Sequence, residues 1–283
     1  MRNIISLTLV LVMLMMLVAC GGGETEKESS ATEATAAVET NPTEGSSGTG
    51  QTTPEDTQTS EEELERMLDE QKDSLLDAIG SVTDISVFSV KEGDIYINNN
   101  SGSKEYTLKA NHGAAAISSI VVGGHEFADG TYLGVSRFIE AGWSCTNLDH
   151  EVSSKFAAMM PCQDPDGKNV IIRGFNQTDG TIAFQDCIVT GVDVKYDGLK
   201  FTATSAADMQ INGSAVTRVD SLTKVIEKVG CPSEIYIEAC FSNGAYSFSR
   251  VTATYYNDGA SLLFEYRIED GKSSLQGITY DFS

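Results

Sequence analysis

The residues that could perform acid–base or nucleophilic chemistry are few in this chain of 283 residues. Its histidines are His112, His125 and His150, and the sequence contains neither a Gly-x-Ser-x-Gly nucleophile elbow nor a His-Glu-x-x-His zinc helix. A thiol–imidazole pair of His150 with Cys145 or Cys162 is the arrangement of this kind that remains. No third member is evident, and His150 lies in a polar stretch typical of an exposed loop. We therefore expect no catalytic residue, and an enzyme built on an unrecognised cysteine or carboxylate site is the alternative.

The segment Asp164–Asn169 has some features of a calcium-binding loop. An EF-hand loop has glycine at its sixth position and glutamate at its twelfth, whereas this segment has Gly167 at the fourth position and Phe175 at the twelfth. An Asp-Gly pair also favours a hairpin turn, which is the better interpretation. No glycine-rich phosphate loop leads from a strand into a helix either, so we expect no metal and no cofactor.

Aromatic side chains are the best indication of a binding surface. Successive residues of a strand face opposite sides of a sheet, so some of these rings belong to the core and others are free to form an exposed strip that contacts a ligand. Packing in the core is the alternative for each of them. The aromatic residues in question are Trp143, Tyr236, Phe241, Tyr246 and Tyr255.

Acidic residues dominate the charge, since 41 Asp and Glu against 19 Lys and Arg give a net charge of −22. No basic stripe that could bind phosphates is visible, which excludes a nucleic-acid-binding protein. Residues 1–80 carry −12 of this charge and residues 81–283 carry −10. The acidity therefore describes the N-terminal segments more than the globular region.

The N-terminus has the features of an export signal. Ile4–Val18 is an almost unbroken apolar run, too short for a comfortable membrane-spanning helix. The four residues that end it resemble the lipobox of bacterial lipoproteins, and this resemblance implies cleavage after residue 19, a diacylglyceryl group on the cysteine, and an extracytoplasmic protein anchored to the bacterial cell membrane. An ordinary signal peptide or a single anchor helix is the alternative. These four residues are Leu17, Val18, Ala19 and Cys20.

Five further cysteines lie beyond this signal. Export permits disulfides, and the pairings closest in sequence are Cys145–Cys162 and Cys231–Cys240, which leave Cys187 alone. Cysteine also packs well as a small buried hydrophobic residue, so five free thiols are the alternative.

A polar linker and a helix follow the signal. Residues 20–60 consist mainly of Glu, Thr, Ser, Gly and Ala, a composition that predicts a disordered tether. Ser60 and Glu63 fit a capping box, which predicts a helix over residues 61–80. Its apolar positions recur at helical spacing and form one stripe, which we expect to pack on the domain that follows; self-association of the helix is the alternative. These positions are Leu64, Met67, Leu68, Leu75 and Ile79.

Residues 81–283 predict an antiparallel α+β region. The sequence alternates between apolar and polar residues, and Asp-Gly and Asn-Gly turns separate the strands. One helix is expected to end near Gly142, and another to run from an N-cap at Asp220 to Gly230. The expected strands are 82–88, 94–97, 104–109, 117–122, 169–173, 181–190, 192–196, 200–204, 234–239, 246–256, 261–268 and 277–282.

The two expected helices end 88 residues apart, at Gly142 and Gly230. Each follows a strand that ends in glycine and precedes several hairpin strands, which predicts two tandem α-β4 repeats at about 117–204 and 205–283; coincidence is the alternative. The unit resembles the repeats of the β-lactamase-inhibitory-protein-like and small outer-membrane-assembly lipoprotein families. Gly230-Cys231-Pro232 carries this likeness, whereas Gly142-Trp143-Ser144 lacks the proline. The resemblance implies a concave sheet that binds another protein or ligand without a catalytic centre.

These observations favour a membrane-anchored extracytoplasmic lipoprotein that binds a protein or cell-envelope ligand. The alternative is a cell-envelope hydrolase with a cysteine or carboxylate site.

Overall fold

The structure is a computed structural model that describes residues 60–98, 101–127, 133–196, 206–257 and 259–282. The expected signal peptide, its lipidated cysteine Cys20 and residues Leu17–Ala19 lie outside the described residues, as do the tether up to residue 59 and the strand expected at 200–204.

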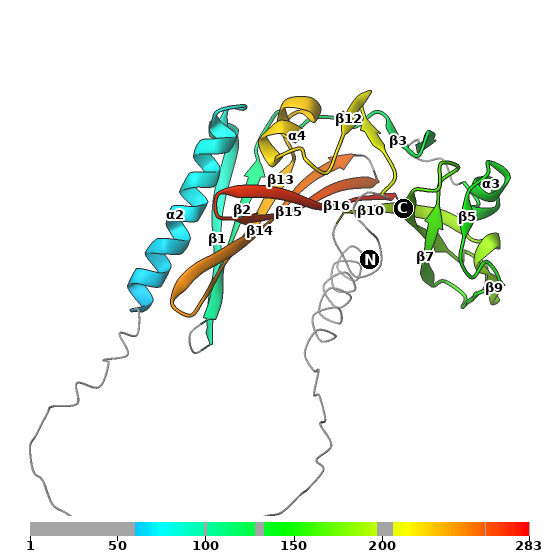
Figure 1. The fold of residues 1–283 in the computed structure, drawn as a ribbon, viewed down its shortest axis with the longest axis horizontal. Coiled ribbons are helices and arrows are strands. Elements are labelled where there is room, and N and C mark those ends of the chain that lie inside the picture. Colours follow the sequence, from blue (N-terminus) through cyan, green and yellow to red (C-terminus); the bar gives the residue numbers. More distant parts are fainter. Residues whose placement is uncertain (1–59, 99–100, 128–132, 197–205, 258, 283) are drawn as a thin grey trace, which may run out of the picture. The chain divides into compact units, whose positions relative to one another are not determined.

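The described chain is mainly antiparallel β-structure with few helices, as the sequence predicts (Figure 1). The helices are α2 (Glu61–Gly80), α3 (Val135–Glu140) and α4 (Leu222–Val229), with 3-10 turns η2 (Ile85–Val87) and η3 (Phe184–Asp186). A ten-stranded sheet has the order β1 (Phe88–Asn98), β2 (Ser101–Ala110), β13 (Glu234–Ser242), β14 (Ala245–Asn257), β15 (Ala260–Glu269), β16 (Lys272–Phe282), β10 (Ile188–Lys195), β8 (Asn169–Phe175), β7 (Ala157–Gln163), β5 (Ser144–Cys145).

The remaining strands form two smaller sheets. A four-stranded sheet has the order β12 (Ser214–Val216), β11 (Met209–Ile211), β3 (Ile120–Val122), β4 (His125–Phe127), and β6 (Glu151–Val152) pairs with β9 (Ile182–Ala183). All the strand pairs within these sheets are antiparallel.

Helix α2 has the predicted boundaries. The hydroxyl of Ser60 caps its N-terminus by accepting a hydrogen bond from the backbone N–H of Glu63. Its apolar stripe is buried against β2, β13 and β14, beside which the helix lies in Figure 1. The buried side chains are Leu64, Leu68, Leu75 and Ile79.

The ten-stranded sheet has two unequal faces. In β13, Ile235, Ile237 and Ala239 are buried on the face that contacts α2, which we call the core face. The alternate residues Tyr236 and Glu238 are half-buried on the opposite face, which we call the open face. The same alternation recurs in β15 and β8, so burial separates the two faces along these strands.

Dipeptide turns close the hairpins. Asn243 and Gly244 join β13 to β14 with φ of 54° and 73°, and Asp270 and Gly271 join β15 to β16 with φ of 51° and 68°. Two consecutive positive φ angles match the right-handed twist of the strands and favour Asn-Gly and Asp-Gly.

Several predicted boundaries were wrong. The N-cap of α4 is Ser221, whose hydroxyl accepts from the backbone N–H of Lys224, while Asp220 accepts from the ammonium of Lys228 at 2.7 Å. The strand expected over 181–190 is interrupted by η3, and the one expected over 192–196 continues β10. Residues 82–88 consist mostly of turn before β1 begins.

The chain passes twice through a similar order of elements. The first pass is β3, β4, α3, β5, β7, β8, β10, with β6 and β9 inserted, and the second is β11, β12, α4, β13, β14, β15, β16. β3 and β11 begin 89 residues apart, at Ile120 and Met209, and they pair with each other. The last strands of the two passes, β10 and β16, also pair.

Candidate binding face

The open face is a continuous surface whose rows follow the strand register. One row crosses eight adjacent strands and ends at the β7 side of the sheet. Its members range from charged on the β2 side to apolar on the β8 and β7 side. The row consists of Lys109, Glu234, Thr254, Leu263, Thr279, Asp193, Ile171 and Pro161.

Two ion pairs cross the junction of β10 and β16 on this face. Arg173 of β8 reaches past Gly191 of β10 to pair with Asp281 of β16. In the opposite direction, the ammonium of Lys195 on β10 lies 2.6 Å from a carboxylate oxygen of Glu265 on β15. Each pair therefore joins strands that are not direct neighbours, and together they tie the two passes of the chain together.

The glycines between these partners leave room for the crossing. A Cβ atom at Gly191 would lie 2.9 Å from the backbone oxygen of Tyr280. A Cβ atom at Gly277, which lies opposite Lys195, would be 2.8 Å from the Cδ atom of that lysine. A glycine in the interior of a strand indicates such a close approach, and this was the signal available in the sequence.

Asp193 lies between the two ion pairs and is only 2% exposed. Its Oδ1 atom is 3.6 Å from Nη2 of Arg173 and has no hydrogen-bond partner. Burial raises the pKa of Asp193, and the charges of Arg173 and Lys195 oppose that rise only in part. A general acid must contact its substrate, and this carboxyl group is too deeply buried to do so.

Aromatic and charged side chains occupy the β1 to β15 part of the open face. Tyr96 is 63% exposed on β1, and Tyr236 is half-buried on β13. The guanidinium of Arg267 lies 3.8 Å from the ring centroid of Phe248, a cation–π contact, and Arg250 pairs with Glu238 at 2.9 Å. This part of the face offers rings and hydrogen-bonding groups together.

The β7 and β8 part of the open face is mainly apolar around the paired Arg173. Met159 is 42% exposed, and Ala157 and Pro161 on the same strand are also exposed. Ile171 and Phe175 of β8 lie beside them, half-buried. The open face therefore combines a polar, aromatic region with an apolar one, a composition suited to contacting another molecule.

Most of the aromatic residues predicted for binding are in the core. Phe241 and Tyr255 are buried on the core face, and the hydroxyl of Tyr255 donates to the backbone oxygen of Gly230 at 2.9 Å. Trp143 is 3% exposed and packs on Phe138 with ring centroids 5.3 Å apart. For these three residues the alternative of core packing holds: the alternation of β13 and β14 turns Phe241 and Tyr255 inward, and Trp143, which precedes β5, packs against α3.

The other two predicted aromatic residues are half-buried. Tyr246 lies opposite the core residue Phe241 and donates its hydroxyl to the backbone oxygen of Ile268. Tyr236 is therefore the one of the five that lies on the open face. The exposed residues Tyr96 and Met159 were not among the predicted binding residues.

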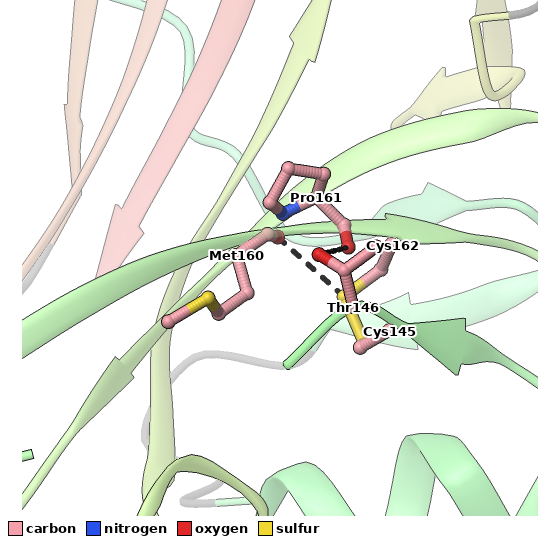
Figure 2. Close-up of a disulfide and its surroundings, with 5 residues drawn as sticks. All are labelled: Cys145, Thr146, Met160, Pro161 and Cys162. Carbon is pink, nitrogen blue, oxygen red and sulfur yellow. Dashed lines mark hydrogen bonds between the residues drawn. A yellow bond between two sulfur atoms is a disulfide. The ribbon is translucent and has the colours of Figure 1, made fainter. Parts of the chain in front are cut away.

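The structure contains one of the two cysteine pairings considered. Cys145 and Cys162 lie opposite each other in β5 and β7 and form a disulfide (Figure 2). Cys187, Cys231 and Cys240 are free thiols. The Cys231–Cys240 pairing was wrong, because extended strand β13 separates these cysteines by roughly 20 Å or more.

The histidines do not form a reactive pair. Cys145 and Cys162 are bonded to each other, which removes the thiol–imidazole arrangement with His150. His125 packs on Phe138 with ring centroids 4.6 Å apart, and burial lowers its pKa. His112 and His150 are exposed.

Within the described residues, no group of three or more His, Cys, Asp or Glu side chains is arranged to hold a metal ion. The expected calcium-like segment is a turn in which Oδ1 of Asp164 accepts backbone N–H groups of Asp166 and Lys168. None of the described helices is both long and apolar enough to cross a membrane. No protein-family model, no curated protein and no solved structure matches this chain.

Proposed function

We propose that the protein is a lipoprotein anchored through Cys20 to the bacterial cell membrane, outside the cytoplasm, where its sheet binds a protein or cell-envelope ligand without converting it. The lipobox-like residues Leu17–Cys20 support the anchor. The Cys145–Cys162 disulfide supports an oxidising compartment.

The open face is the observation that carries the binding function. The buried side chains of the core concentrate on the opposite face, while the open face holds Tyr96, Tyr236 and Met159 together with paired arginines and carboxylates. Rings and hydrogen-bonded charges beside apolar side chains are typical of surfaces that bind other molecules.

We propose further that the two passes of the chain are tandem α-β4 repeats at about 117–204 and 205–283. The shared order of elements, the 89-residue spacing and the pairing of corresponding strands support this. Under this proposal Gly191 corresponds to Gly277, and the two crossing ion pairs correspond to each other. Tandem repeats of this kind are also what the resemblance to the β-lactamase-inhibitory-protein-like and small outer-membrane-assembly lipoprotein families implies.

A quantitative pull-down tests the binding function. The tagged full-length chain is cross-linked in its native membrane and recovered, and the co-purifying partner is quantified. Thr252→Lys places a long charged side chain on the open face, and we expect recovery of the partner to fall about tenfold. Thr223→Lys changes another half-buried threonine, on α4, and serves as the matched control.

Equal recovery with both variants would contradict binding by the open face. The hydrolase alternative gives a different outcome, namely turnover of cell-wall or peptide substrates that a single carboxylate substitution abolishes.

A further inference from the structure

Strand β7 forms most of one edge of the ten-stranded sheet. Its neighbour β5 covers only the end of it, by pairing Ser144 with Gln163 and Cys145 with Cys162. In the part of the chain that the structure describes, no strand pairs with the outer side of Ala157–Met160. We call this segment the free edge of β7.

At alternate residues of the free edge, the backbone N–H and C=O groups point outward, away from β8. The backbone N–H of Thr146 donates to the backbone oxygen of Pro161 at 3.0 Å, so this carbonyl points away from β8. The hydroxyl of Thr146 donates to the same oxygen at 3.2 Å (Figure 2). Residues at a spacing of two share this direction, which turns the N–H and C=O groups of Met159 and Ala157 outward. The proline fits the same geometry, because it lacks an N–H only on the outward side.

The chemistry of the free edge differs from that of the opposite edge of the sheet. The seven residues of β7 carry no charge, and Met159 is 42% exposed. Strand β1, at the other edge, carries Lys91, Glu92 and Asp94 and a register shift beside them. Charges and bulges of this kind prevent strands from adding to a sheet, and β7 lacks both next to its exposed backbone.

We propose that the free edge of β7 binds an extended segment of a partner protein, which adds to the sheet as a further strand. The segment is uncharged over about four residues, because β7 offers no charge to pair with, and apolar at alternate positions so that it packs beside Met159 and Ala157. Main-chain hydrogen bonds from these two residues fix the register of the bound segment. Strand β5, which the Cys145–Cys162 disulfide holds in place, limits the bound segment at one end.

The length of the free edge selects a peptide segment over a second copy of this chain. Four residues span only about 13 Å. A stable dimer buries about 800 Å² on each partner, far more than a strand of this length supplies. A short extended segment needs no larger contact to bind weakly.

Peptide selection on the full-length chain, held in detergent and immobilised, tests the proposal. Random linear peptides displayed on phage are the probe, and the recovered sequences are synthesised for affinity measurements. Met159→Pro removes one outward N–H and leaves the bonds to β8 intact, because residue 159 does not bond to β8. Met159→Leu keeps the N–H and is the matched control.

We expect the recovered peptides to be uncharged and apolar at alternate positions. Met159→Pro should weaken their binding about tenfold, while Met159→Leu changes it by less than about threefold. N-methylation of one alternate set of peptide nitrogens should abolish binding, and methylation of the other set should not, a readout that holds even if the proline variant fails to fold.

Three results would overturn the proposal. The first is recovery of no peptide, or only of charged ones. The second is equal sensitivity to both N-methylation patterns. The third is a dimer in sedimentation that Met159→Pro dissociates, since the occupant would then be a second copy.

Discussion

Lys104 holds helix α2 on the sheet through charge, and replacing it by methionine tests this role. The side chain lies on the core face of β2 and the residue is 3% exposed. Its ammonium is 2.8 Å from Glu65 and 3.1 Å from Asp69 on α2, and 3.6 Å from Glu92 on β1. The hydroxyl of Tyr106 donates to the same Asp69 at 2.5 Å. Methionine retains the volume of the lysine side chain but removes the cation shared by three carboxylates.

We expect Lys104→Met to lower the free energy of unfolding by about 2 kcal/mol. Removing one partner of a fully buried ion pair costs about 3–5 kcal/mol. Here the loss is smaller, because the side chains of Glu65, Asp69 and Glu92 are 48%, 36% and 57% exposed and water solvates the charges left behind. For a domain of this size the change corresponds to about 4–8 °C in melting temperature.

The pH dependence of the free energy of unfolding that Lys104→Met loses gives a second readout. Burial alone raises the pKa of Asp69, but hydrogen bonds from Tyr106 and Lys104 outweigh it and hold this pKa below its usual value. A carboxyl group with a lowered folded pKa stabilises the fold above its unfolded pKa of about 3.9, and this stabilisation is lost as the pH falls through the folded value. The difference between wild type and Lys104→Met should therefore be constant at neutral pH and shrink as the pH falls below about 4, through the lowered pKa of Asp69.

Denaturant unfolding followed by circular dichroism measures these changes. Lys109→Met is the matched control, because Lys109 lies on the open face of the same strand with a 68% exposed side chain and pairs with Glu234 at 3.5 Å. It should cost less than about 1 kcal/mol. Equal losses in the two variants, or a Lys104→Met protein as stable as wild type at neutral pH, would refute the role of Lys104.

Three further predictions concern the covalent links and the sheet junction. Replacing both Cys145 and Cys162 by serine should lower the free energy of unfolding by about 3 kcal/mol, because the bridge joins residues separated by 17 positions; urea titration measures the loss, and an unchanged midpoint would argue against the disulfide. Cys20→Ala should abolish incorporation of a palmitate analogue, and equal labelling of variant and wild type would exclude lipidation at this residue. Gly191→Ala places a methyl group 2.9 Å from a backbone oxygen and should cost about 1–3 kcal/mol, whereas Gly180→Ala, which meets open space, should melt close to wild type.

The elements whose signals are local could be predicted from the sequence. The boundaries of α2 follow from the Ser60 cap and the apolar spacing of Leu64 and Leu68, all within one helix. The hairpin turns at Asn243-Gly244 and Asp270-Gly271 follow from the positive φ that these residues tolerate. The N-cap of α4 was misplaced by one residue because Asp220 and Ser221 are both good caps, and Lys228 draws the aspartate away.

The binding face could not be predicted in the same way. Which side of β13 is buried depends on its pairing with β2, which precedes it by more than 120 residues and brings Tyr106 and Leu108 beside Ile237 and Ile235. The residues of β13 alone therefore do not show that Phe241 faces the core and Tyr236 the open face. Such choices of face are decided by contacts between distant segments, and the alternation of one strand is compatible with either side.

The crossing ion pairs could not be predicted from the sequence for the same reason. Arg173 and Asp281 are 108 positions apart and meet only because β8, β10 and β16 are neighbours in the sheet. Gly191 and Gly277, as glycines in the interior of strands, are the sign of this arrangement in the sequence.

Site-specific photo-crosslinking in living cells tests the binding face most directly. A photoreactive phenylalanine analogue replaces Tyr96 or Tyr236 on the open face, or Lys224 on α4, whose side chain is 54% exposed. We predict a discrete cross-linked partner from both open-face positions and none from Lys224. Cross-links from Lys224, with none from Tyr96 and Tyr236, would contradict the assignment of the open face as the binding surface.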